Sequence, residues 1–117
     1  MSARAAVTRS DRLSRPGRRA VVVADLGTLR GPTTGVVTLP HRLVWAPSPA
    51  GRFDLADAYD RTRLYEIVLR EAVRAAELQT WLSGDLLTEL WPGLYLPRGV
   101  RQAWEDVHQR LAAVPVV

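Results

Sequence analysis

Three aspartates, Asp54, Asp57 and Asp60, recur at intervals of three residues and come closest to a metal-binding pattern in this sequence. Carboxylates that share one face of a helix can offer oxygen ligands to a hard cation. Carboxylates in a first helical turn are also favoured by the helix dipole, and an Asp that caps a helix needs no metal. Because no histidine is close enough in sequence to complete a local site, we expect a helix cap, no metal and no cofactor.

The only two histidines, His41 and His108, lack the neighbours that acid–base catalysis requires. A general acid or base needs a hydrogen-bonded partner within a cleft, and nothing local supplies one. Both are therefore predicted to be surface or boundary residues. The absence of cysteine excludes a disulfide, a thiol nucleophile and a Cys-ligated metal. We predict no catalytic residue, and we expect that the protein is not an enzyme.

Two segments look like phosphate- or DNA-binding motifs but lack their chemistry. Residues 29–35 (Leu-Arg-Gly-Pro-Thr-Thr-Gly) lack the Gly-Lys-Ser/Thr ending of a phosphate loop, and Pro32 removes an N–H that would face the anion. We predict a turn there. Helical segments near 76–82 and 85–91 could form a helix-turn-helix, but the exposed face of the second offers Asp85, Thr88 and Glu89. Those carboxylates would repel phosphates, so this motif is not expected.

Aromatic residues are numerous for so small a chain, with four Trp and three Tyr. Most are expected in the core. The segment 91–97 (Trp-Pro-Gly-Leu-Tyr-Leu-Pro) is different, because it is apolar, irregular and stiffened by proline, so docking it costs little ordering entropy. Trp, Tyr and Arg dominate the binding energy of many protein interfaces. The predicted protein-binding residues are Trp91, Leu94, Tyr95, Arg98 and Arg101.

A small antiparallel sheet is predicted for the first half of the chain. The whole sequence has 117 residues, enough for one domain, and 47% of them are apolar. The run Val21–Val23 indicates a strand over about 19–26. Residues 35–46 predict two short strands, or one edge strand broken at Pro40. A Pro- and Gly-rich loop is expected at 46–53.

The second half is predicted to be helical, because apolar residues recur there every three or four positions. Helices are expected over about 57–74, 76–82, 85–91 and 98–112, with an extended link at 94–96. On the first of them, the polar face carries Arg63, Glu66, Arg70 and Arg74. The predicted fold class is therefore α+β: a two- or three-stranded antiparallel sheet followed by three to four short helices.

The positive charge is concentrated at the start of the chain. All sixteen basic residues are Arg; six of them fall in residues 1–19 against one acid, Asp11, for a net charge of +5. Residues 20–117 hold ten Arg and eleven acids, a net of −1. We predict a disordered arm over 1–19 and a single domain over 20–117. The apolar run 20–24 is too short for a secretory signal, and no stretch suits a membrane span, so we expect a cytoplasmic protein without membrane contact.

Several short segments between about residues 25 and 110 are similar to segments of a known group of proteins. They are the segments 29–35, 38–40, 43–45, 64–72, 90–92, 96–97 and 103–105. With these motifs the chain resembles small uncharacterised actinobacterial proteins encoded beside nucleotidyltransferase toxins of the AbiEii type. The resemblance implies a toxin–antitoxin or phage-defence setting, with this chain as the antitoxin or an accessory subunit. It identifies no functional residue.

Two functional hypotheses follow from the sequence. The first is a protein-binding module whose apolar, Arg-edged face occludes the nucleotide or acceptor-RNA cleft of a nucleotidyltransferase toxin. The second is a nucleic-acid-binding regulator that contacts phosphates through its N-terminal arm, and this binding would be salt-sensitive and blind to sequence. The residues predicted for the second are Arg4, Arg9, Arg12, Arg15, Arg18 and Arg19.

Overall fold

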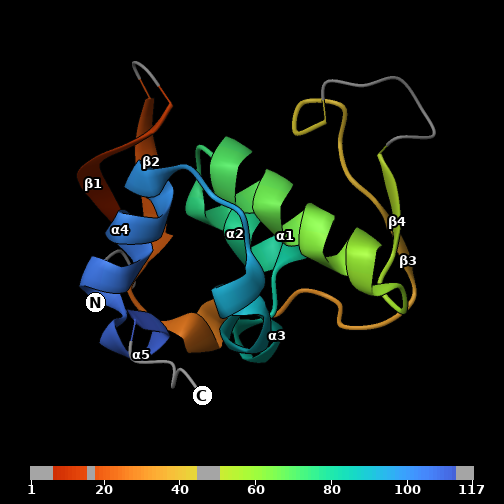
Figure 1. Ribbon diagram of the computed structural model, residues 1–117. Helices are drawn as coiled ribbons and strands as arrows, with labels where there is room; N and C mark the ends of the chain where they lie inside the picture. Colours follow the sequence, from red (N-terminus) through yellow and green to blue (C-terminus); the bar gives the residue numbers. More distant parts are fainter. Residues whose placement is uncertain (1–6, 16–17, 45–50, 113–117) are drawn as a thin grey trace.

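The described part of the chain folds into two small antiparallel sheets and five α-helices (Figure 1). This computed structural model describes residues 7–15, 18–44 and 51–112, with residues 7–15 and 18–19 described by their backbone alone. The elements are β1 (Val7–Arg15), β2 (Arg18–Val23), η2 (Leu26–Thr28), β3 (Val36–Thr38), β4 (Arg52–Asp54), α1 (Ala58–Glu71), α2 (Ala75–Trp81), α3 (Gly84–Leu90), η3 (Trp91–Gly93), α4 (Arg98–Val107) and α5 (Gln109–Ala112). The predicted α+β class, a small antiparallel sheet followed by short helices, is confirmed.

Strands β1 and β2 form a hairpin where the sequence predicts a disordered arm. The register pairs Val7 with Val23 at one end and Arg15 with Arg18 at the other, with two register shifts between them. An isolated strand leaves its backbone N–H and C=O groups without partners, and β1 supplies those partners to β2. Residues 7–15 and 18–19 of the predicted arm therefore belong to paired strands. The rest of the predicted arm, residues 1–6 and 16–17, lies outside the described residues.

The second sheet pairs β3 with β4, and Val37 lies opposite Phe53. Residues 35–46 were predicted to form two short strands, or one edge strand broken at Pro40. The structure forms a strand on one side of Pro40 alone: β3 ends at Thr38, residues 41–43 are a turn, and residues 45–46 lie outside the described residues. Strand β4 lies partly inside the segment predicted to be a loop, and residues 46–50 of that segment are outside the described residues. A three-residue strand bounded by loops has too few residues for its period to be recognised.

The core lies between the hairpin and the helices. Figure 1 shows β1, β2, α4 and α5 on one side of α1 and the β3–β4 sheet on the other. Hairpin residues 20–23 are buried, as are most residues of the predicted apolar stripes of α1 and α4, including Leu64, Tyr65, Val100 and Trp104. Val107, which the periodicity placed on the apolar stripe of α4, is instead 37% exposed. The last helix differs from the prediction in one respect: it breaks at His108 into α4 and α5.

Candidate functional site

The segment predicted to be a protein interface contributes two of its residues to the core instead. Trp91 is 1% exposed and Leu94 is 4% exposed, so neither can anchor a partner, and the prediction is wrong for both. The physical reason is the turn η3, which directs the Trp91 ring inward to lie 6.3 Å from the ring of Trp104. Such a packed indole stabilises the fold through its large apolar surface.

Arg101 is also occupied within the protein. Its guanidinium lies 4.8 Å from the centre of the Trp91 ring and donates hydrogen bonds to the carbonyl oxygens of Trp91 and Leu94. It also forms an ion pair of 3.4 Å with Glu105, which accepts a 3.0 Å hydrogen bond from Trp91 Nε1. Arg101 therefore secures the η3 turn to α4, a structural role that the sequence pattern did not reveal.

The remaining two predicted interface residues, Tyr95 and Arg98, are exposed. Tyr95 is 86% exposed, the most of any large hydrophobic side chain among the described residues. Its backbone N–H donates a 2.7 Å hydrogen bond to Glu66 on α1, so the link between η3 and α4 is held against the middle of that helix. Figure 1 shows this link running across α1. The ring of Tyr95 is thus presented to solvent from a backbone that is anchored.

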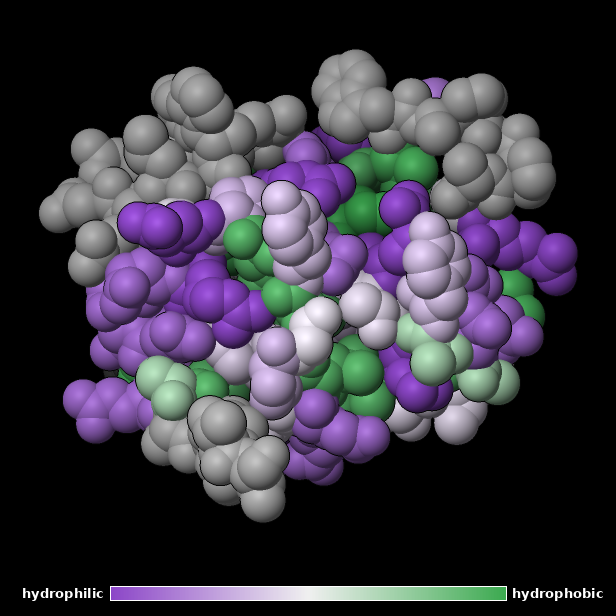
Figure 2. All heavy atoms as spheres, viewed as in Figure 1, coloured by the Kyte–Doolittle hydropathy of each residue, from purple (hydrophilic) through white to green (hydrophobic). Residues whose placement is uncertain are grey.

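A second exposed tyrosine lies along the same side of α1. Tyr59 is 68% exposed, and the guanidinium of Arg63 lies 5.8 Å from the centre of its ring. Residues 59, 63, 66 and 70 follow one another at helical spacing, and Tyr95 lies beside Glu66. We name the surface formed by Tyr59, Arg63, Glu66, Arg70 and Tyr95 the α1 ridge. Figure 2 shows that hydrophilic residues cover most of the visible face, with hydrophobic patches near its centre.

Sequence reasoning missed Tyr59 because it precedes the amphipathic pattern that identified the helix. A signal was nevertheless present. Tyr59 is four residues before Arg63, and Arg63 was already on the predicted polar face. An aromatic residue in register with the polar face of a helix must project into solvent, where its apolar surface stays hydrated unless something covers it.

The three aspartates of the possible metal site form a helix cap, as predicted. Asp57 is the N-cap of α1 and accepts a 2.8 Å hydrogen bond from the backbone N–H of Asp60. The carboxylate of Asp60 accepts one of 3.1 Å from the N–H of Asp54, and the carboxylate of Asp54 accepts one from Ala56. Over residues 7–15, 18–44 and 51–112, no three His, Cys, Asp or Glu side chains gather as they would around a metal ion.

The two histidines lie at the surface and at a boundary, as predicted. His41 is exposed in the turn after β3. His108 is half-buried; its Nε2 lies 2.7 Å from the carbonyl oxygen of Val23, and its ring stacks on Trp104 at 5.7 Å. This contact joins the α4–α5 break to the end of β2, 85 residues away in sequence. His108 therefore contributes to the packing of the hairpin.

The glycine-containing segment 29–35 has the irregular, turning backbone that was predicted, with bends at residues 33–35. The N–H of Gly31, which a phosphate loop would direct to an anion, donates instead a 2.7 Å hydrogen bond to the carbonyl oxygen of Leu82. A Cβ at Gly31 would overlap the backbone of Trp81 and Leu82, so this close approach requires glycine. Gly35 has a φ of +88°, which also favours glycine.

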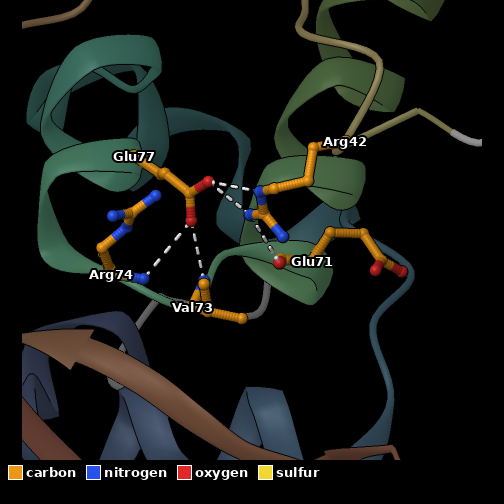
Figure 3. Close-up of polar contacts among 5 residues, drawn as sticks. All are labelled: Arg42, Glu71, Val73, Arg74 and Glu77. Carbon is orange, nitrogen blue, oxygen red and sulfur yellow. Dashed lines mark hydrogen bonds and ion pairs between the residues drawn. The ribbon is translucent and has the colours of Figure 1, made fainter.

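A polar cluster around Glu77 joins the turn after β3 to the connection between α1 and α2, residues 72–74 (Figure 3). Glu77 accepts hydrogen bonds from the backbone N–H groups of Val73 (2.8 Å) and Arg74 and forms an ion pair with Arg42. Burial opposes ionisation of Glu77, but these hydrogen bonds and the Arg42 charge outweigh it and hold the pKa below its usual value. Arg42 also donates to the carbonyl oxygen of Glu71. The cluster is structural, since each of these polar groups forms its hydrogen bonds or ion pair with another group of the cluster.

Tyr65, the third tyrosine, is fully buried. Its hydroxyl oxygen accepts a 2.8 Å hydrogen bond from the backbone N–H of Ser83, the N-cap of α3. Burial raises the pKa of Tyr65 to about 12, although the hydrogen bond from Ser83 acts in the opposite direction. Tyr65 therefore ties α1 to the start of α3 and is inaccessible to a partner.

The arginines proposed for nucleic-acid binding lie mostly on the hairpin. Arg9, Arg12 and Arg15 belong to β1, and Arg18 and Arg19 belong to β2. Arg4 lies outside the described residues. The five positions share one two-stranded ribbon instead of the predicted disordered arm.

No family model, curated protein or solved structure matches this chain. Among the helices of the described residues, none combines the length and the apolar character that a bilayer crossing requires.

Proposed function

We propose that this protein acts by binding another protein through the α1 ridge, as an antitoxin-like or accessory subunit of a nucleotidyltransferase toxin system. The observation that carries the proposal is the exposure of Tyr59 and Tyr95, at 68% and 86%, on one side of α1. The ridge replaces the predicted interface of residues 91–101, because Trp91 and Leu94 are buried in the core and Arg101 is bonded to η3 and Glu105.

The composition of the ridge favours a protein partner. Tyr and Arg are enriched among the residues that supply most of the binding energy at interfaces. Tyr59 and Glu66 are seven residues apart, about 10 Å along the helix axis, so the two exposed rings can enter separate pockets of one partner. The contact of Arg63 with the Tyr59 ring and the hydrogen bond between Tyr95 and Glu66 hold the ridge in place before binding. This organisation reduces the entropy that docking must overcome.

The class of partner comes from the resemblance to proteins encoded beside AbiEii-type nucleotidyltransferase toxins. In this proposal the ridge covers the nucleotide or acceptor-RNA cleft of the toxin and blocks access to it. Inhibition by occlusion needs no catalytic group on this chain. It requires only that the bound partner buries both tyrosines.

The test is co-expression with the product of the neighbouring gene, measured by pull-down and by growth rescue. The double variant Tyr59→Ala/Tyr95→Ala should lose the complex, because each buried aromatic anchor contributes on the order of 2 kcal/mol, or about 30-fold in affinity. The matched control is Val36→Ala/Val107→Ala, which truncates the two other large exposed hydrophobic residues of the described chain, both outside the ridge. It should bind and rescue like the wild type.

Two results would remove the proposal. One is the absence of both complex and rescue with wild-type protein. The other is equal binding by the ridge variant and the control variant, which would place the interface elsewhere.

A further inference from the structure

The β1–β2 hairpin has an apolar end and a cationic end. At the apolar end, Val7 pairs with Val23, and β2 residues 20–23 are buried in the core. At the other end, Arg15 pairs with Arg18, and Leu13 pairs with Arg19. Arg12 precedes Leu13 directly, so four arginines fall near this end of the ribbon. The buried valines anchor the hairpin and leave its Arg-rich end at the rim of the molecule (Figure 1).

The hairpin carries the positive charge of the protein. Residues 7–15 and 18–19 hold five Arg and one acid, Asp11, a net charge of +4, whereas residues 20–117 have a net charge of −1. Arginine stays protonated at any physiological pH. A cluster of this kind on a folded element is the electrostatic footprint of a polyanion-binding surface. The same charge on a disordered tail would lack a defined shape.

We propose that the Arg-rich end of the β1–β2 hairpin is a docking site for duplex DNA, contacting phosphates along the major groove. The major groove of B-form DNA is about 12 Å wide and admits a two-stranded β-ribbon, whose strands lie about 5 Å apart. The major groove of A-form RNA is too deep and narrow to be entered in this way. The register shifts between Arg9 and Arg15 mark irregularities that increase the twist of a ribbon.

The contacts in this proposal go to phosphates. The cationic end offers arginine and serine but no Asn or Gln, the residues that pair with adenine in the major groove. Binding is therefore expected to depend little on sequence and strongly on salt. If Arg12, Arg15, Arg18 and Arg19 each neutralise one phosphate, the slope of log K against log salt is about −3.6. Affinity then falls about 150-fold between about 50 and 200 mM salt.

The experiment measures binding of the full chain to a labelled duplex of arbitrary sequence, about 20 base pairs long, by fluorescence anisotropy. The hairpin variant changes Arg12, Arg15, Arg18 and Arg19 to Gln. The matched control variant changes four exposed arginines of the body to Gln and removes the same charge; these are Arg52, Arg63, Arg98 and Arg110. Circular dichroism establishes that both are folded. A third variant replaces the four hairpin arginines with Lys, which retains the charge.

The hairpin variant should bind about 100-fold more weakly than wild type at about 50 mM salt, and its salt slope should approach zero. The body variant should stay within about threefold of wild type, and the Lys variant within about tenfold. The site is refuted if the wild type does not bind at this low salt, or if the hairpin and body variants lose equal affinity. It is also refuted by equal or tighter binding of duplex RNA or single-stranded DNA. If the hairpin variant does not fold, three measurements still test the proposed DNA site: the salt slope of the wild type, the affinity of the Lys variant, and the preference of the wild type for duplex DNA over duplex RNA.

Discussion

Substitution of Tyr65 by Phe tests how α1 is joined to α3. The tyrosine hydroxyl is buried and accepts a hydrogen bond from the N–H of Ser83. Removing it leaves a buried donor without its partner, which costs about 1–3 kcal/mol. An unfolding entropy of about 2.1 cal/mol/K per residue gives about 0.25 kcal/mol/K for this chain, so Tm should fall by about 4–12 °C.

The same substitution should abolish an alkaline loss of stability. Because burial raises the pKa of folded Tyr65 to about 12, against an ordinary value of 10.0, the neutral phenol is the form that the fold favours. Its contribution is complete below about pH 10 and is lost as the pH rises toward about 12. The loss by about pH 11.5 is about 2 kcal/mol. The chain has no Lys or Cys, and Arg stays protonated, so few other side chains titrate in this window.

The assay is urea unfolding followed by tryptophan fluorescence at neutral pH and at intervals from about pH 9 to 11.5. Wild type should lose stability over the alkaline range, and Tyr65→Phe should start lower and lose about 2 kcal/mol less. Tyr95→Phe is the control: it removes a hydroxyl from an exposed ring and keeps Tyr65. The reasoning fails if Tyr65→Phe matches wild type at neutral pH within about 0.3 kcal/mol and retains the same alkaline loss.

Three further predictions concern the polar contacts of the core and the two proposed surfaces. Glu77→Gln should cost about 1–3 kcal/mol, because the carboxylate pairs with Arg42 and accepts backbone hydrogen bonds. Since the folded pKa of Glu77 is lowered, this contribution exists above the unfolded value near 4.5 and disappears as the pH falls, so unfolding titrations over the acid range should show a shallower loss in the variant. Trp91→Phe should be more destabilising than Trp104→Phe by about 1 kcal/mol, because Trp91 Nε1 donates to Glu105 whereas the buried Trp104 Nε1 has no hydrogen-bond acceptor. Chemical unfolding followed by circular dichroism measures this order, and the reverse order would contradict it. Finally, the α1 ridge and the Arg-rich end of the hairpin share no residue, so the ridge variant should keep its DNA affinity and the hairpin variant should keep its protein partner; a change in the other affinity would reveal coupling between the two surfaces.

Local sequence patterns predicted the helical half of the chain well. The apolar spacing of Leu64, Tyr65 and Val68 placed α1, and the run of aspartates at its start predicted a cap, which the structure identifies as Asp57. The irregular connection at 29–35 was also predictable. These features depend on residues within one or two turns of each other, so the information needed to specify them lies in a short window.

The interface was harder to predict, because exposure depends on contacts that are distant in sequence. Trp91 and Tyr95 lie in the same irregular segment and are equally suited to an interface by composition. One is buried against Trp104 and the other is 86% exposed. Arg101 on α4 donates a hydrogen bond to the carbonyl oxygen of Trp91, and Glu66 on α1 accepts one from the N–H of Tyr95. Contacts with two different helices therefore determine the conformation of this segment. An irregular segment has no periodicity from which its buried side can be inferred.

By itself the sequence determined where helices form, that an aspartate caps the first of them, and that the positive charge is concentrated in the first nineteen residues. Only the tertiary structure decided that most of this charge lies on a β-hairpin, because a strand exists only with a partner to complete its hydrogen bonds, and β1 finds that partner in β2. The tertiary structure likewise decided which aromatic rings face solvent, since burial is a property of the assembled core and not of any one segment.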